Sequence, residues 1–180
     1  MAIRPIFKFP APELKEPAHA VRNIDAQVND LVSDLVETMY AAPGLGLAAP
    51  QLGSSERVIV LDVREEEPKL GLIKLINPVL VKAEGSILWE EGCLSVVDYT
   101  AEVRRASHVL VKAWTPDEQE IEIEGEGLLA VALQHEIDHL EGKLFIDRVS
   151  RLKRDLYRRR VKKWLREGVP LESRKAAPGI

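Results

Sequence analysis

The chain has 180 residues, of which 46% are hydrophobic and 30% are charged, a composition typical of a globular protein with one domain. Its longest wholly apolar run, Leu128–Leu133, is far shorter than the roughly 20 residues that a membrane span needs. Met1–Pro10 contains no apolar signal region, so neither secretion nor membrane insertion is expected. The single cysteine, Cys93, excludes an internal disulfide bond, and we expect a protein of the reducing cytoplasm.

The net charge of −4 is distributed unevenly along the chain. Residues 1–146 carry 13 Lys and Arg against 25 Asp and Glu, whereas residues 147–180 carry 12 against 4. An acidic body is therefore followed by a basic C-terminal segment. Such a segment either attracts phosphate backbones or is simply the solvated face of a helix.

The N-terminal half predicts an arm, a helix and then strands. Prolines dominate residues 1–23, which are expected to form an irregular arm. Apolar residues then repeat at helical spacing from Ile24 to Met39, with Asp25 as the N-cap and Pro43-Gly44 after the end. Beyond Gly53, short segments rich in Val, Ile and Leu predict strands at Arg57–Val63, Ile73–Ile76, Pro78–Lys82, Ser86–Trp89, Thr100–Val103, Val109–Trp114 and the strictly alternating Glu120–Glu124.

Two further helices are predicted in the C-terminal half. Gly127–Glu141 is apolar on every side through Leu133, so this helix belongs in the middle of a core. A basic helix follows over about residues 150–167, with a tail at 169–180 that we expect to be disordered. Its expected packing stripe consists of Leu152, Leu156, Val161, Trp164 and Leu165. The fold class is therefore α+β, with small antiparallel β-sheets around a buried central helix and one domain over residues 1–168.

The strongest chemical motif lies on the buried helix. His135 and His139 are four residues apart, so both imidazoles lie on one helical face and can bind a single divalent metal ion. Glu136 lies beside the first histidine, where it can act as a general base. With four histidines in 180 residues, an HExxH match arises by chance in about 1% of such chains.

Two histidines need a further protein ligand to complete a catalytic metal site. Cys93 is the other strong candidate by residue type, in the segment Glu91-Gly92-Cys93-Leu94-Ser95. A lone cysteine is more often a small buried apolar residue, but the turn around Gly92 and the polar Ser95 make an ordinary core position less convincing.

A third segment, Gly44–Gln51, is small, apolar and ends in one amide. It lacks the Lys-Ser/Thr of a phosphate-binding loop. Glycines allow a backbone to approach a ligand closely, and an extended segment can pair with a peptide as an added strand. Taken alone, the segment is better explained as a plain hydrophobic turn.

Together these segments resemble the peptide deformylase family, whose members carry GxGxAAxQ, EGCLS and QHExDHLxG in this order. The chain has them at Gly44–Gln51, Glu91–Ser95 and Gln134–Gly142. The resemblance extends over roughly residues 1–165 and implies a metal-dependent hydrolase that removes the N-formyl group from N-formylmethionyl nascent peptides, releasing formate. The acidic body with its basic tail favours the bacterial type.

The resemblance also implies a role for each site residue. Cys93, His135 and His139 are the metal ligands, and Glu136 is the general base and then the general acid. Gln51 and the Leu94 backbone N–H stabilise the oxyanion. The peptide lies between Leu45-Gly46 and Gly92, and its methionine enters a pocket walled by Val131, Ala132 and His135. We also hypothesise that Arg104 or Arg105 orients Glu91.

The donor set suits one divalent metal ion per chain, either Fe(II), Zn, Ni or Co. The family implies Fe(II) in the cell and zinc in a stable but often sluggish form, and a thiolate beside Fe(II) would make activity oxygen-sensitive. The basic helix is a candidate for docking on the ribosome through rRNA. Many family members have a proline or an acidic loop soon after CLS, whereas this chain has Val96–Thr100 there. This difference bears on which substrate residues beyond the methionine are preferred.

Two other classes of protein compete with this interpretation. HExxH also marks zinc endopeptidases, which take their third ligand downstream, where this chain has no histidine. A non-enzymatic RNA-binding module would need four protein ligands for a structural metal, and only three are evident. Metal loss in a Cys93→Ala variant would favour the deformylase over the endopeptidase.

Overall fold

The computed structural model describes residues 2–64, 68, 70–171 and 174. Its main sheet has five antiparallel strands in the order β1-β2-β3-β6-β7. The central strands are rich in β-branched residues, as the sequence predicts. The strands span β1 Gly46–Ala48, β2 Val58–Asp62, β3 Leu72–Glu84, β6 His108–Trp114 and β7 Glu120–Glu126.

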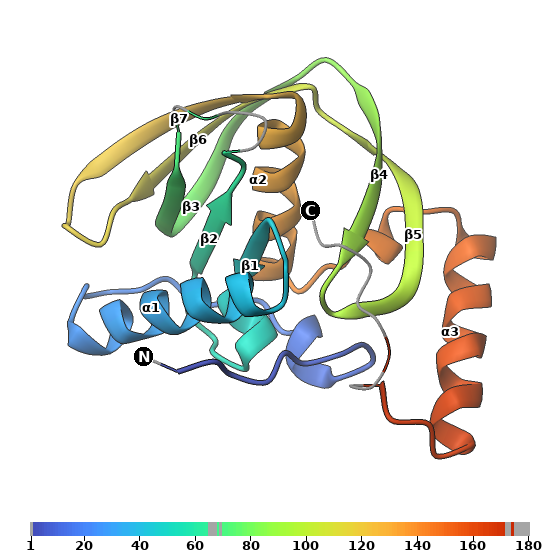
Figure 1. The fold of residues 1–180 in the computed structure, drawn as a ribbon. Helices are drawn as coiled ribbons and strands as arrows, with labels where there is room; N and C mark the ends of the chain where they lie inside the picture. Colours follow the sequence, from blue (N-terminus) through green and yellow to red (C-terminus); the bar gives the residue numbers. More distant parts are fainter. Residues whose placement is uncertain (1, 65–67, 69, 172–173, 175–180) are drawn as a thin grey trace.

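One helix covers each face of this sheet (Figure 1). Helix α1, Ala26–Ala41, packs against Val58 and Val60, whereas α2, Gly127–Leu140, packs on the face that carries Ile59 and Leu61. The alternation follows from the two-residue period of a strand, and it explains why every residue of β2 is buried. The side chain of Asp25 accepts from the backbone N–H groups of residues 27 and 28, which confirms the predicted N-cap.

A two-stranded antiparallel hairpin, β4 Ile87–Cys93 and β5 Val96–Arg105, lies on the other side of α2 (Figure 1). Helix α2 is therefore enclosed between the sheet and the hairpin, as the apolar character of its sequence predicts. Short 3-10 helices connect these parts: η1 Pro12–Lys15, η2 Ala49–Leu52 and η3 Phe145–Asp147. The α+β fold class with its buried central helix is confirmed. None of the described helices is long and apolar enough to span a membrane.

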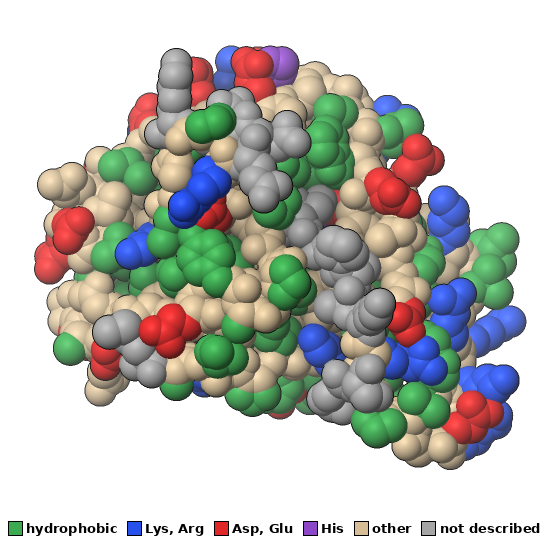
Figure 2. All heavy atoms as spheres, viewed as in Figure 1, with side chains coloured by type: hydrophobic (Ala, Val, Ile, Leu, Met, Phe, Trp, Pro, Cys, Tyr) green, Lys and Arg blue, Asp and Glu red, His purple; other side chains and the backbone are tan. Residues whose placement is uncertain are grey.

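Helix α3, Arg151–Arg166, lies on the outer side of the hairpin. Its basic side chains gather on the outer surface (Figure 2). The expected packing stripe is largely wrong, because Leu152, Leu156 and Leu165 are exposed. Val161 is buried as expected, and so is Tyr157, which lies outside the expected stripe and whose hydroxyl donates to the carbonyl of Val97 on β5. The helix has two alternative apolar edges, and the hairpin packs against the one that contains tyrosine.

Other elements also differ from the expectations. The two strands expected around residues 73–82 are one strand, β3, in which Asn77 takes a left-handed conformation with φ of 53° at a register shift. The tail expected at 169–180 falls largely outside the described residues. Leu171 is nevertheless buried against the hairpin core, and the Arg174 guanidinium lies 3.8 Å from the ring centroid of Trp164. This is packing that a disordered tail would not have.

Candidate active site

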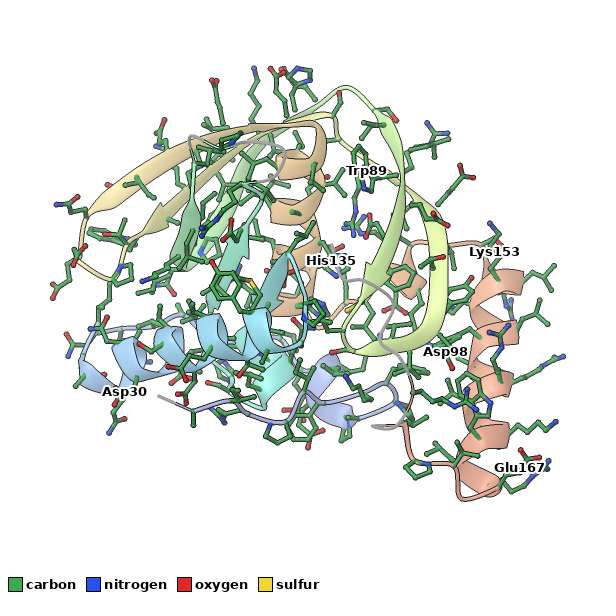
Figure 3. All side chains as sticks on the ribbon, in the orientation of Figure 1. Asp30, Trp89, Asp98, His135, Lys153 and Glu167 are labelled. Atoms are coloured by element: carbon green, nitrogen blue, oxygen red, sulfur yellow. The ribbon has the colours of Figure 1, made fainter. Side chains whose placement is uncertain are left out.

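Cys93, His135 and His139 come together where the end of β4 meets α2. Figure 3 labels His135, which lies between α2 and the hairpin. The two histidines lie one turn apart on α2, and Cys93 is the last residue of β4. One ligand atom from each residue lies within 4.8 Å of the other two, and all three side chains are buried. Within the part of the chain that the structure describes, this is the one group of three such residues that could hold a metal ion.

The chemistry of this donor set fits a metal ion. Cys93 Sγ and His139 Nε2 are 3.3 Å apart, close to the separation of about 3.6 Å that tetrahedral coordination of a zinc-sized ion gives. Burial raises the pKa of the Cys93 thiol to about 12, and a divalent cation would reverse this by stabilising the thiolate. Burial, followed by the adjacent imidazole of His135, holds the pKa of His139 well below its usual value, which keeps this ring neutral. The cluster therefore supports one metal ion per chain.

A buried ion-pair network fixes the orientation of His135. Its Nδ1 lies 2.8 Å from a carboxylate oxygen of Glu91, and Arg105 binds both Glu91 oxygens at 2.6 and 2.8 Å. Burial acts to raise the pKa of Glu91, but hydrogen bonds from Arg105 and His135 outweigh it and lower that pKa. Of the two arginines proposed to orient Glu91, Arg105 does so, whereas Arg104 contacts Ser86 at the surface.

Asp138 completes the network on the same helix. It accepts from Arg105 on one side and from Arg148, before α3, on the other. Sequence reasoning missed the contact between Glu91 and His135. Strand alternation could not have given it, because the predicted strand ended at Trp89 and a register shift separates Glu91 from Cys93; the acidic residue two positions before Cys93 was the one local signal.

Glu136 directly follows the metal-ligand candidate His135 on α2, and the residue is buried, with 1% of its surface exposed. Among the described residues, its Oε2 has no hydrogen-bond partner. Burial, followed by the charge of Glu91, raises its pKa well above the ordinary value. A Cβ atom built on Gly46 would lie only 2.4 Å from Glu136 Oε1, so a glycine is needed where β1 passes this carboxylate.

Gln51 approaches the cluster from η2. Its Nε2 lies 3.1 Å from Ser95 Oγ and 3.7 Å from Cys93 Sγ, while its Oε1 accepts from the N–H of Ala48 at 2.8 Å. The last bond fixes which end of the amide faces the metal ligands, so Gln51 presents its donor to the cluster. Leu94, in the turn that follows Cys93, is buried beside Gly44. The three sequence motifs therefore meet at one place.

The expected substrate-binding residues lie in different environments. Leu45 is half-buried and Gly46 is buried on β1, the edge strand of the sheet, and Gly92 is buried on β4. Val131 and Ala132 lie on α2 in the core that it shares with the sheet, and both are 0% exposed. Contact between either residue and a substrate side chain would therefore require neighbouring atoms to move.

Comparison with known proteins agrees with this geometry. A family model described as "Polypeptide deformylase" matches residues 3–155. A peptide deformylase of Syntrophobacter fumaroxidans is 52% identical over 167 residues, which cover 93% of this chain and 98% of that protein.

Solved structures give the same result. A crystal structure of a peptide deformylase from Legionella pneumophila has a TM-score of 0.84 and 45% identity, covering 93% of this chain and 98% of that one. One from Ehrlichia chaffeensis, in complex with actinonin, has a TM-score of 0.85 and 37% identity, covering 91% and 98%. These matches decide against the zinc endopeptidase that HExxH alone leaves open. The chain belongs to the peptide deformylase family, metal-dependent hydrolases that remove the N-formyl group from nascent peptides.

Proposed function

We propose that Cys93, His135 and His139 hold the metal ion of this deformylase and that Glu136 performs its proton transfers. The observation that supports the proposal is the buried carboxylate of Glu136, which has an unpartnered oxygen among the described residues and lies beside three converging metal-ligand atoms. A buried acid without a partner costs stability, so its retention next to a metal site favours a catalytic role.

Each residue then has a defined task in the reaction. When bound, a divalent cation supplies Lewis-acid chemistry, which lowers the pKa of water and polarises a carbonyl oxygen. Glu136 accepts the proton of the water that attacks the formyl carbon and returns it to the departing amine. Gln51 Nε2 and the Leu94 N–H donate to the oxyanion, and loss of one such donor typically costs about 3–4 kcal/mol in barrier height. The products are formate and a peptide with a free N-terminus.

The substrate lies extended along the outer edge of β1, between Leu45-Gly46 and the backbone of Gly92. The position of β1 at the end of the sheet supports this placement, because an edge strand can accept a further strand through backbone hydrogen bonds. The methionine side chain enters a pocket walled by Val131, Ala132 and His135. Since the first two are fully buried, binding includes a local opening of this wall.

We propose Fe(II) as the metal in the cell, with Zn, Ni or Co as alternatives in preparations. A thiolate and two imidazoles suit all four ions. Because a thiolate beside Fe(II) is oxidisable, the Fe(II) enzyme loses activity in air while the Ni(II) enzyme keeps it.

Residues 1–168 act as one catalytic domain in the cytoplasm, with α3 as a docking surface for rRNA at the ribosome. Support for docking comes from ten Lys and Arg residues within residues 148–166, many of them exposed on α3. Binding to a ribosomal RNA fragment should weaken steeply as salt rises and should fail after charge reversal at Lys153 and Lys163. Unchanged binding in that variant would contradict docking through α3.

Formate release from formyl-Met-Ala-Ser, measured anaerobically with Fe(II) or Ni(II) enzyme, tests the proposed function. We expect rapid release by the native chain and almost none by Glu136→Ala. The control is Glu141→Ala at the exposed C-cap of the same helix, which should keep full activity. No release by the metal-loaded native chain would overturn the proposal.

A further inference from the structure

The two groups proposed to stabilise the oxyanion come from separate parts of the molecule. Gln51 lies on η2, beside the α1 side of the sheet, and Leu94 lies in the turn between β4 and β5. The Gln51 side chain joins η2 to the hairpin through its Nε2, which lies 3.1 Å from Ser95 Oγ and 3.7 Å from Cys93 Sγ. The relative position of these donors therefore needs further support, because small displacements of such groups are costly in catalysis.

A short N-terminal segment supplies this support. We call residues Phe7–Phe9 the strap. The Phe7 N–H donates to the carbonyl of Gln51 and the Phe9 N–H donates to the carbonyl of Ser95, both at 2.8 Å. The strap thus joins η2 to the hairpin turn with two backbone hydrogen bonds that lie two residues apart. In Figure 1 this N-terminal part of the chain runs along the base of the molecule, below the turn between β4 and β5.

Lys8, between these two anchors, contacts the turn through its side chain. Its Nζ donates to the carbonyl oxygen of Leu94 at 2.6 Å, and the side chain is half-buried. A hydrogen bond from an ammonium group is roughly twice as strong as one between neutral groups. With Leu94 O held by Lys8 and Ser95 O held by the strap backbone, the Leu94–Ser95 and Ser95–Val96 peptide groups, directly after the one that carries the Leu94 N–H, have fixed orientations.

We infer that Lys8 is a positioning residue for deformylation: by holding the carbonyl of the Leu94–Ser95 peptide group, whose N–H donates to Cys93 Sγ, it restrains the backbone at Leu94, and the N–H of Leu94 donates to the oxyanion. The inference rests on the proposed function, in which that N–H takes part. Lys8 lies outside the three family motifs, and in this role it acts through Leu94 and does not itself touch the substrate. It therefore affects the rate of the chemical step more than the binding of the peptide, whose contacts come from β1 and Gly92.

The test compares Lys8→Met, which keeps the length of the side chain, with Lys8→Arg, which restores a charged donor. In the Ni(II) enzyme we expect Lys8→Met to lower kcat for formyl-Met-Ala-Ser about tenfold while KM stays within about twofold. Lys8→Arg should recover most of the loss. The matched control is Lys82→Met, an exposed lysine paired with Glu84 on β3, which should behave as the native chain.

Metal content and thermal midpoint separate positioning from a structural role. Metal content should be unchanged in Lys8→Met, because the three metal ligands remain. The thermal midpoint should stay well above the assay temperature, because the hydrogen bond to Leu94 that the change removes is a modest part of a domain's stability. An unchanged kcat, or a loss of kcat that follows a loss of metal or stability, would overturn the inference. Failure of the native chain itself to release formate would instead overturn the proposed function, so the two failures are distinguishable.

Discussion

His135 and Glu91 form a buried contact in which the ring Nδ1 lies 2.8 Å from the carboxylate, and Arg105 holds the other side of that carboxylate. A carboxylate accepts hydrogen bonds, so the contact places the ring proton on Nδ1 and leaves Nε2 as the ligand atom. Metal-binding histidines are commonly oriented in this way, and the partner also raises the basicity of the ligand.

The contact predicts that Glu91 controls metal affinity without being a ligand. Glu91→Gln should weaken binding of Zn or Co(II) about 10–100-fold, because it replaces the charged acceptor of the His135 proton with a neutral amide. Competition with a chelator measures the change. Glu90→Gln is the control, since this neighbouring residue is exposed and its carboxylate accepts from the Thr100 hydroxyl, away from the metal ligands. Equal affinities in the two variants would contradict the role.

Arg105 is predicted to stabilise the fold strongly. Arg105→Met leaves Glu91 and Asp138 buried without their shared cation, which should cost about 3–5 kcal/mol in the free energy of unfolding. Denaturant unfolding of the metal-free protein measures this. Arg104→Met, at an exposed position next to it, should change the value by no more than about 0.5 kcal/mol. Similar losses in both variants would show that the network adds little.

Gly46→Ala is predicted to damage catalysis more than folding. The added methyl group would lie 2.4 Å from Glu136 Oε1 and 2.9 Å from a methyl carbon of Leu61, so the carboxylate has to leave its present place. We expect kcat for formate release to fall at least about tenfold with metal content unchanged. A variant with native kcat would mean that Glu136 does not need the position observed here.

Asp62 is predicted to make stability depend on acid pH. The hydrogen bond from Arg64 comes first among the causes that lower its pKa, which falls to about 2 from an ordinary 3.8. Because the folded pKa is the lower one, Asp62 stabilises the fold above about pH 4, and this contribution is lost as pH falls through about 2. The difference in unfolding free energy between the native chain and Asp62→Asn should therefore shrink from pH 5 to pH 2. If the difference in unfolding free energy were the same at pH 5 and pH 2, the predicted contribution of the Asp62 carboxylate would be contradicted.

The sequence predicts those parts of the fold whose pattern has a single interpretation. The apolar helix at 127–141 is typical of a core helix, and Asp25 before a periodic segment matches the pattern of an N-cap. The sequence predicts the three metal ligands as one set because His135 and His139 share a helix face and Cys93 is the single cysteine. The resemblance to the family gave their roles.

The remaining features depend on tertiary contacts that no local pattern encodes. Helix α3 has apolar residues on more than one side, and only the position of the hairpin decides that Tyr157 is buried while Leu152 is exposed. Likewise, Lys8 is 86 positions from Leu94 in the chain, so their hydrogen bond leaves no signal in a single sequence.

The position of β1 at the edge of the sheet has a consequence for the range of peptides that the protein can process. Backbone N–H and C=O groups are the same in every chain, so a substrate held along this edge is distinguished mainly by its first residue and its formyl group. If the substrate binds along β1 as proposed, the three residues of this strand limit the bound length, and a processed peptide can leave easily. An edge this short is also a poor template for aggregation. Short-lived binding that depends little on the peptide sequence suits an enzyme that must act once on many different chains.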